Sequence, residues 1–387
     1  MARLCTKVFA MTEHGERYRV KCLSCGYEKL VSDLLSISLC PRCGSVLGVN
    51  HSNNVFRVDL MGRGVWRYSS LLPSIPERIS LGEGLTPISK FGSVWIKNER
   101  FNPTGSYADR ASAVIISYIK SCGWSLFTSL YERDFTKSLV RYAQSQNMQC
   151  RVVALGMNFM DIDDILFLAS KNIEVSFNID NEEKPFVRYA NPLTIEGLKT
   201  IAFEIYESGV SAERIVVPSE TGLLALSILK GLNELRESGI DINYEIVAVS
   251  LKNSSPSYLA GVRDVKVVEI GDGEAYEALK NVISKGFNTK PLSALSIYVA
   301  ENFGKAVAVL TMGFKTLSTR SSNVKRMIIE VLLQEKRPLT AYEIWKTKPV
   351  YTLRAVYKAL KSMELANEIC FDVVSKGMRK TKVYKLC

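Results

Sequence analysis

Short, continuous apolar runs alternate along the middle of the chain with longer segments whose apolar residues recur at helical spacing. The runs that suit buried strands include 152–155, 215–217, 246–249 and 307–310. Strands that are apolar on both faces are typical of parallel sheets covered by helices. This rhythm therefore predicts an α/β fold with a parallel-sheet core.

One strand-to-helix turn is rich in small and polar residues. The strand-like run Val94–Lys97 precedes the stretch Asn102–Arg110, which reads NPTGSYADR. Apolar residues at helical spacing follow it, and Gly123 is expected to end that helix. A helix N-terminus after such a turn is a common cradle for anions and cofactors. Most such turns bind nothing, so the geometry alone assigns no function.

The pattern changes after a polar hinge at 316–323. Helical spacing predicts a first helix at 323–336, and a second that Thr340 caps with Glu343 in a capping box. Thr352 is expected to cap a third helix. The predicted buried stripe of that helix consists of Leu353, Val356, Leu360 and Met363.

The last segment, 368–386, reads as a hairpin with a basic tip. Residues 321–387 carry 14 basic and 6 acidic side chains, so +8 of the net charge of +11 lies there. Three helices and a basic hairpin resemble a winged helix-turn-helix, whose third helix enters the major groove of DNA. We therefore expect double-stranded DNA as a partner. The residues expected to contact it are Tyr351, Thr352, Arg354, Lys358, Lys361, Lys376, Arg379, Lys380 and Lys382.

Paired CxxC knuckles near the start of the chain predict a metal site. Cys22 and Cys25 are separated from Cys40 and Cys43 by 14 residues, and a glycine follows each pair. Four thiolates at this spacing select a tetrahedral structural zinc, with no open position for catalysis. The sequence thus predicts a zinc ribbon in residues 1–50.

The composition favours a globular protein in the cytoplasm. The chain has 387 residues, 47% of them hydrophobic and 23% charged. No apolar run approaches the roughly 20 residues that span a bilayer, so no membrane partner is expected. The first residues lack a secretory apolar region. Nine cysteines in such a chain indicate a metal site and free thiols rather than a disulfide framework.

The stretch NERFNPTGSYADR resembles the cofactor-lysine segment of threonine synthases, pyridoxal-phosphate enzymes of fold type II. In that family the motif usually reads N-P-T-G-S-F-K-D-R, and its lysine binds the cofactor covalently. Here that position holds Ala108. A methyl group can neither form an imine nor carry a proton, so no catalytic residue and no bound pyridoxal phosphate are expected.

The resemblance extends from about residue 20 to 318, through GVWRYSSLLP, ISLGEGLTPI, NPLTIEGLKTIAFEIYE and AVLTMGFK. It implies a two-lobed core of fold type II at 51–318, with a cofactor cleft between the lobes. We expect the winged helix at 322–387.

The resemblance also implies that the cleft has decayed. The stretch 128–134 lacks the family's Gly-Asn pair, and in the phosphate loop at 217–223 only Gly222 remains, beside the carboxylate of Glu220. Lys290 replaces an acid. Thr311 keeps the position of the contact to the pyridine nitrogen, so Thr311 and Gly222 are the vestigial cofactor residues. We expect side chains to fill the cleft.

These observations predict a non-catalytic threonine synthase-like protein that binds DNA, as a transcription regulator or DNA-associated factor. Left open are a cleft that senses a small anionic metabolite, and a core that serves as a homodimer scaffold. One alternative function is an active pyridoxal-phosphate lyase or threonine synthase with an unorthodox base such as Lys97. Another is a structural subunit that docks proteins through the ribbon and the winged helix.

Overall fold

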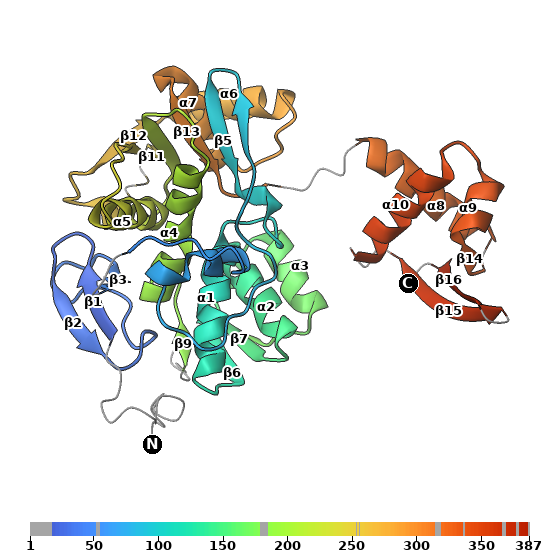
Figure 1. Ribbon diagram of the computed structural model, residues 1–387, viewed down its shortest axis with the longest axis horizontal. Helices are drawn as coiled ribbons and strands as arrows, with labels where there is room; N and C mark the ends of the chain where they lie inside the picture. Colours follow the sequence, from blue (N-terminus) through green and yellow to red (C-terminus); the bar gives the residue numbers. More distant parts are fainter. Residues whose placement is uncertain are drawn as a thin grey trace. The chain divides into compact units, whose positions relative to one another are not determined.

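The computed structural model forms two compact units, Met1–Phe314 and Lys315–Cys387. The two units are described separately below (Figure 1). The structure describes residues 18–51, 55–178, 185–252, 254, 256–313, 319–335, 337–365, 369–376 and 379–385.

The first unit begins with a small antiparallel sheet, in which β1 (Tyr18–Cys22) lies between β2 (Glu28–Val31) and β3 (Leu47–Val49). Gly26 and Gly44 follow the two cysteine pairs at φ values of 71° and 72°. Only glycine adopts this left-handed backbone without a steric penalty, so these residues close the two knuckles as expected.

The larger lobe is built on a six-stranded sheet of order β12-β11-β10-β13-β5-β4. All of its neighbours pair in parallel except β4 and β5. All four predicted strands are present, three in this sheet (β10, β11 and β13) and one in the smaller lobe (β7). The strands of this sheet are β4 (Ile88–Phe91), β5 (Val94–Asn98), β10 (Arg214–Pro218), β11 (Glu245–Leu251), β12 (Val265–Ile270) and β13 (Ala306–Leu310). Its helices are α5 (Leu223–Glu237), α6 (Asp272–Ser284) and α7 (Pro291–Phe303).

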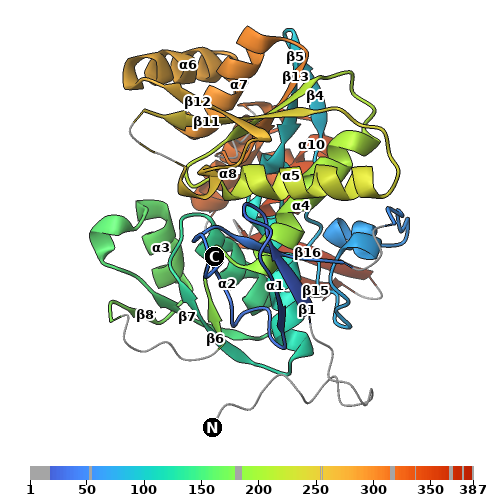
Figure 2. The ribbon, with the colours of Figure 1, turned by 90° about the vertical axis from the view of Figure 1, so that its left-hand side faces the viewer.

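The smaller lobe contains a parallel four-stranded sheet of order β8-β7-β6-β9 (Figure 2). Its strands are β6 (Leu126–Leu130), β7 (Gln149–Val153), β8 (Val175–Ser176) and β9 (Phe186–Val187). The helices of this part are α1 (Ala108–Ser121), α2 (Phe135–Ser145), α3 (Ile162–Ser170) and α4 (Pro192–Glu207). Short 3-10 helices are η2 (Gly64–Leu71), η3 (Glu99–Phe101), η4 (Met157–Phe159) and η5 (Ser257–Leu259). The two lobes confirm the predicted α/β class.

A buried cluster of charges joins the small N-terminal sheet to helices α4 and α5. Lys199 lies between Glu196 and Glu234 at 2.5 and 2.8 Å, and Lys230 contacts both carboxylates. His51, two residues after β3, bonds Glu196 at 2.9 Å. The backbone N–H of Val49 in β3 also donates to Glu196. This cluster, His51–Glu196–Lys199–Lys230–Glu234, is called the ribbon–core ion cluster below.

The second unit has the order α8 (Thr319–Glu335), β14 (Leu339–Thr340), α9 (Ala341–Thr347), α10 (Leu353–Leu365), β15 (Cys370–Lys376) and β16 (Arg379–Lys385). Its antiparallel sheet has the order β14-β16-β15. The capping box between Thr340 and Glu343 is present, as predicted. Helix α8 already begins at Thr319, so the hinge predicted at 316–323 is wrong from 319 onward. Residues 316–318 lie outside the described part.

Val356, Leu360 and Met363 of α10 are buried in the core of this unit, which confirms most of the predicted stripe; Leu353 is half-buried. Within the described residues, no helix combines the length and the apolar character that crossing a membrane requires.

Candidate functional site

The stretch Asn102–Arg110 positions the start of α1. Asn102 accepts from the backbone N–H of Gly84 at 2.9 Å and donates to Glu99. Gly105 has a φ of 82°, a backbone conformation that favours glycine. Ala108 is the first residue of α1 and is 1% exposed. The turn therefore keeps a rigid frame around a side chain with no reactive atom.

Arg110 anchors this frame through a fully buried ion network. Its guanidinium bonds Glu99 at 2.7 Å and Glu204 at 2.6 Å, and Lys97 bonds Glu204 at 2.5 Å. Burial alone raises a carboxyl pKa, but the charges of Arg110 and Lys97 prevail and lower the pKa of Glu204 to about 2. Lys97 also donates to the backbone carbonyl of Thr86 at 2.7 Å. It is absent from the cavity described next, so the structure gives no support to Lys97 as an unorthodox base.

A cavity of about 330 Å³ opens beside the start of α1, and this corrects the expectation that side chains fill the cleft. Both predicted vestigial residues, Thr311 and Gly222, line it together with Glu220 and Lys290. Its other lining residues are Tyr107, Glu132, Arg133, Asp134, Tyr189, Pro218, Ser219, Thr221, Leu223, Leu224, Leu251, Ser254, Pro291, Leu292 and Ser293.

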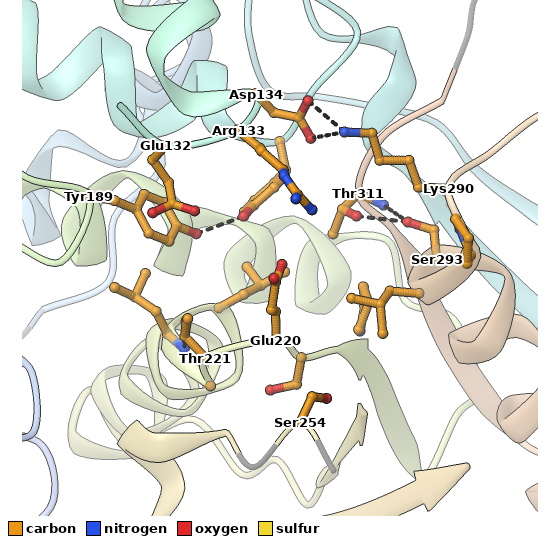
Figure 3. Close-up of a pocket in the computed structure, with 18 of the residues that line it drawn as sticks. Glu132, Arg133, Asp134, Tyr189, Glu220, Thr221, Ser254, Lys290, Ser293 and Thr311 are labelled. Atoms are coloured by element: carbon orange, nitrogen blue, oxygen red, sulfur yellow. Dashed lines mark hydrogen bonds and ion pairs between the residues drawn. The ribbon is translucent and has the colours of Figure 1, made fainter. Parts of the chain in front are cut away.

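Polar contacts fix several of these side chains (Figure 3). Lys290 holds both carboxylate oxygens of Asp134, at 2.9 and 3.0 Å. Asp134 has a φ of 62°, which is uncommon outside glycine and is stabilised here by that pairing and by its place before α2. The Tyr107 and Tyr189 hydroxyls bond each other at 2.7 Å. The Thr311 hydroxyl lies 2.7 Å from that of Ser293.

Two further carboxylates face the same cavity without an ion-pair partner among the described residues: Glu132, in the loop after β6, and Glu220, in the loop before α5. Burial raises the pKa of Glu132 to about 7, and the negative charge of Glu220 adds to this effect. The cavity therefore concentrates negative charge.

Residues 79–264 match the family of pyridoxal-phosphate dependent enzymes. The chain is also similar to threonine synthases: 26% identical over 273 residues to that of Methanosarcina acetivorans, covering 62% of this chain and 66% of that protein. With the threonine synthase of Methanocaldococcus jannaschii it shares 29% identity over 257 residues, which cover 57% of this chain and 62% of the relative. The matches thus span less than two thirds of these relatives.

The solved structure of cysteine synthase from Entamoeba histolytica is similar to this chain in fold. The TM-score is 0.51 at 15% identity, over 74% of this chain and 97% of that structure. This likeness concerns the fold alone, and it supports an α/β fold that resembles fold type II.

The cavity does not fit the cofactor of this family. Lys290, the lysine that lines the cavity, is held by Asp134, and Ala108, where the sequence resemblance has the cofactor lysine, offers no amine. Gly222 precedes α5 with a φ of 95°, but Glu220 places a carboxylate two residues before it. A like charge there opposes a phosphate dianion at the helix N-terminus.

The four predicted zinc ligands come together. Their sulfur atoms all lie within 4.8 Å of one another, with Cys22–Cys43 at 3.5 Å and Cys25–Cys40 at 3.7 Å. Zn–S bonds of about 2.3 Å in a tetrahedron place sulfurs about 3.8 Å apart, so this set could bind zinc. Cys150 is a free thiol, as expected for the other cysteines. Cys122 and Cys370 are each part of a disulfide rather than free thiols, so the expectation of free thiols is wrong for these two.

The predicted DNA-contacting residues fall into three groups. Arg354, Lys358 and Lys361 are exposed on α10. Thr352 accepts from the backbone N–H of Ala355 as the cap of α10, and Tyr351 is half-buried, its carbonyl held by Trp345.

On the hairpin, Lys382 is exposed but bonds Glu364 at 2.5 Å, so it is not a free cation. The side chains of Lys376, Arg379 and Lys380 lie outside the described residues.

Sequence reasoning missed the pairing of Asp134 with Lys290 and of Tyr107 with Tyr189. One signal for the first was present: Lys290 stands where the resemblance has an acid, and Asp134 stands in the stretch that lacks the Gly-Asn pair. Two opposite charge changes in one cleft indicate a new ion pair. The tyrosine pair joins residues 82 positions apart and had no such signal.

Proposed function

We propose that this protein is a non-catalytic relative of threonine synthase that binds double-stranded DNA through its second unit, as a transcription regulator or DNA-associated factor. In this proposal the cavity of the first unit senses a small molecule. The observation that carries it is Ala108, a buried methyl at the start of α1 where the family's cofactor lysine belongs. Without an amine at this point the cavity can bind but not catalyse.

The second unit supplies the support for DNA binding. Arg354, Lys358 and Lys361 form an exposed basic face on α10, and the order of helices and strands resembles that of a winged helix-turn-helix. Backbone contacts from such a face give an affinity that falls steeply with salt. Because Lys382 is paired with Glu364, the proposal assigns most of the phosphate contact to α10.

A triple variant of α10 tests the DNA-binding role. Changing Arg354, Lys358 and Lys361 to Gln is expected to weaken duplex binding by about tenfold or more at moderate salt, and to lower the slope of log affinity against log salt by about 2 to 3. A mobility-shift titration at several salt concentrations measures both. The charge-matched control changes the exposed Lys90, Lys171 and Lys252 of the first unit to Gln.

Equal affinities of the two triple variants would contradict the assignment to α10. No shift of duplex DNA by the natural chain, even at low salt, would favour the docking-subunit alternative.

A trapping experiment tests the absence of catalysis. Pyridoxal phosphate incubated with the protein and then reduced with borohydride is expected to leave no adduct on Lys290 above the background labelling of exposed lysines, as read by peptide mapping, because Ala108 offers no amine and Asp134 holds Lys290. A known pyridoxal-phosphate enzyme, treated in the same way, shows that trapping works. An adduct at Lys290, or turnover of phosphohomoserine, would overturn the proposal.

A further inference from the structure

We infer that the cavity takes a small organic cation, an aliphatic primary amine, whose ammonium group lies between Glu132 and Glu220. This inference rests on the proposed function, since it names the class of molecule that the non-catalytic cavity senses. It departs from the small anionic metabolite that the sequence left open as a possible ligand.

The charge balance of the cavity wall is the first argument. Three carboxylates line the cavity, those of Glu132, Asp134 and Glu220, against the two cations of Arg133 and Lys290. The positive charge of Lys290 is neutralised by its ion pair with Asp134. Arg133 projects into the cavity toward Glu220 (Figure 3), and it can offset only one of the two remaining carboxylates. Arg188 borders both carboxylates in a neighbouring cavity and does not line this one. Among the residues that line this cavity, one negative charge is therefore left without a counterion, and a ligand ammonium would neutralise it.

The position of Glu220 is the second argument. The start of α5 carries a partial positive charge from its unpaired N–H groups, and Gly222, the residue before that helix, lines the cavity. An anion would bind there if the loop were neutral. The carboxylate of Glu220 already lies near the partial positive charge at the start of α5. A second anion is therefore repelled, and a cation is attracted to this carboxylate.

An unpartnered hydroxyl is the third argument. Ser219, a lining residue, is 2% exposed, and its Oγ has no hydrogen-bond partner in the described part of the chain. Burying a polar atom without a hydrogen-bond partner costs free energy. We therefore take the Ser219 hydroxyl as a group to which a bound ligand forms a hydrogen bond. An ammonium carries three N–H donors, enough for both carboxylates and this hydroxyl.

The remaining wall fits an aliphatic chain. Leu223, Leu224, Leu251 and Leu292 contribute apolar surface, and a cavity of about 330 Å³ is at the small end of ligand sites. A short amine of about four carbons therefore suits it better than a large aromatic cation.

Calorimetric titration of the full-length protein with 1,4-diaminobutane tests the inference, with inorganic phosphate and pyridoxal phosphate as anionic comparators. We expect the diamine to bind and both anions not to. Glu132→Gln and Glu220→Gln should each lower the affinity for the diamine by about tenfold, because each substitution removes one charged hydrogen bond. Glu269→Gln, an exposed carboxylate outside the cavity, is the matched control and should bind like the natural chain.

The pH dependence adds a signature that a structural role would not produce. The groups that face Glu132 are Glu220, Arg133, Asp134, Arg188 and the tyrosines Tyr107, Tyr189 and Tyr258. Since the pKa of Glu132 is about 7, the diamine should bind more tightly as the pH rises through that value, and Glu132→Gln should flatten the profile.

Absence of diamine binding to the natural chain, tighter binding of phosphate, or equal affinities in all three variants would each overturn the inference. Circular dichroism of every variant confirms that it is folded. A negative result for diamine binding would not change the expected mobility shift of duplex DNA or the expected result of borohydride trapping. Failure of the inference can therefore be told apart from failure of the proposed function.

Discussion

Replacing Arg110 with methionine is expected to lower the free energy of unfolding by about 3 to 5 kcal/mol, the cost of leaving buried charges without their partner. Arg110 is fully buried and bonds both Glu99 and Glu204, which are themselves buried. Methionine fills similar space but neutralises neither carboxylate. Denaturation in guanidinium chloride, followed by circular dichroism, measures the change.

Two comparison variants make this result specific. Arg151→Met removes an exposed arginine that pairs with Glu174 at 2.9 Å, and it should cost less than about 1 kcal/mol. Adding Glu99→Gln to Arg110→Met removes one stranded charge and should recover part of the loss. A double variant no more stable than the single one would show that packing, and not charge, sets the cost.

The same network gives a pH dependence. Because the pKa of Glu204 is lowered from 4.5 to about 2, its stabilising contribution is complete above the ordinary value. That contribution is lost as the pH falls through about 2. Acid titration of the natural chain should therefore show a loss of stability in this range, and Arg110→Met should lack most of it.

The largest effect expected from the first unit comes from Cys40→Ala. Cys40 is 3% exposed and one of four sulfurs within 4.8 Å of one another. With three ligands left, the site should lose its zinc, falling from about one ion per chain to none, and the melting temperature should drop by many degrees. Elemental analysis by mass spectrometry and a thermal melt measure these quantities.

Cys150→Ala is the control for this change, because Cys150 is a buried free thiol outside the cluster. If Cys40→Ala yields no folded protein, a strong chelator applied to the natural chain answers the same question. Zinc added back should then restore the melting temperature. A natural chain that contains no zinc after purification in its presence would contradict the assignment.

The regular elements could be predicted from the sequence because local patterns determine them. Continuous apolar runs located β10, β11 and β13, and the pair Thr340 and Glu343 located the start of α9. Cysteine spacing located the four-sulfur cluster for the same reason. The start of α8 was missed because Thr319 to Asn323 are polar, and polar residues are as common in an exposed helical turn as in a linker.

The cavity was less accessible to such reasoning. Whether a cleft collapses depends on how residues from distant segments pack, and the chain pairs Lys290 with Asp134 instead of filling the space. The raised pKa of Glu132 likewise arises first from its burial and then from the charge of Glu220, which is 88 positions away along the chain but faces the same cavity. The composition of the chain could show neither the open cavity nor the raised pKa of Glu132.

The ribbon–core ion cluster has a consequence for how the first unit can be divided. Helices α4 and α5 place Glu196 and Glu234 beneath β3, and His51 completes the set from the ribbon side. Cutting the chain after the ribbon would expose two lysines and two glutamates that are buried in the intact unit, so neither fragment should fold autonomously. We therefore expect this N-terminal sheet to unfold together with the lobes in one cooperative transition.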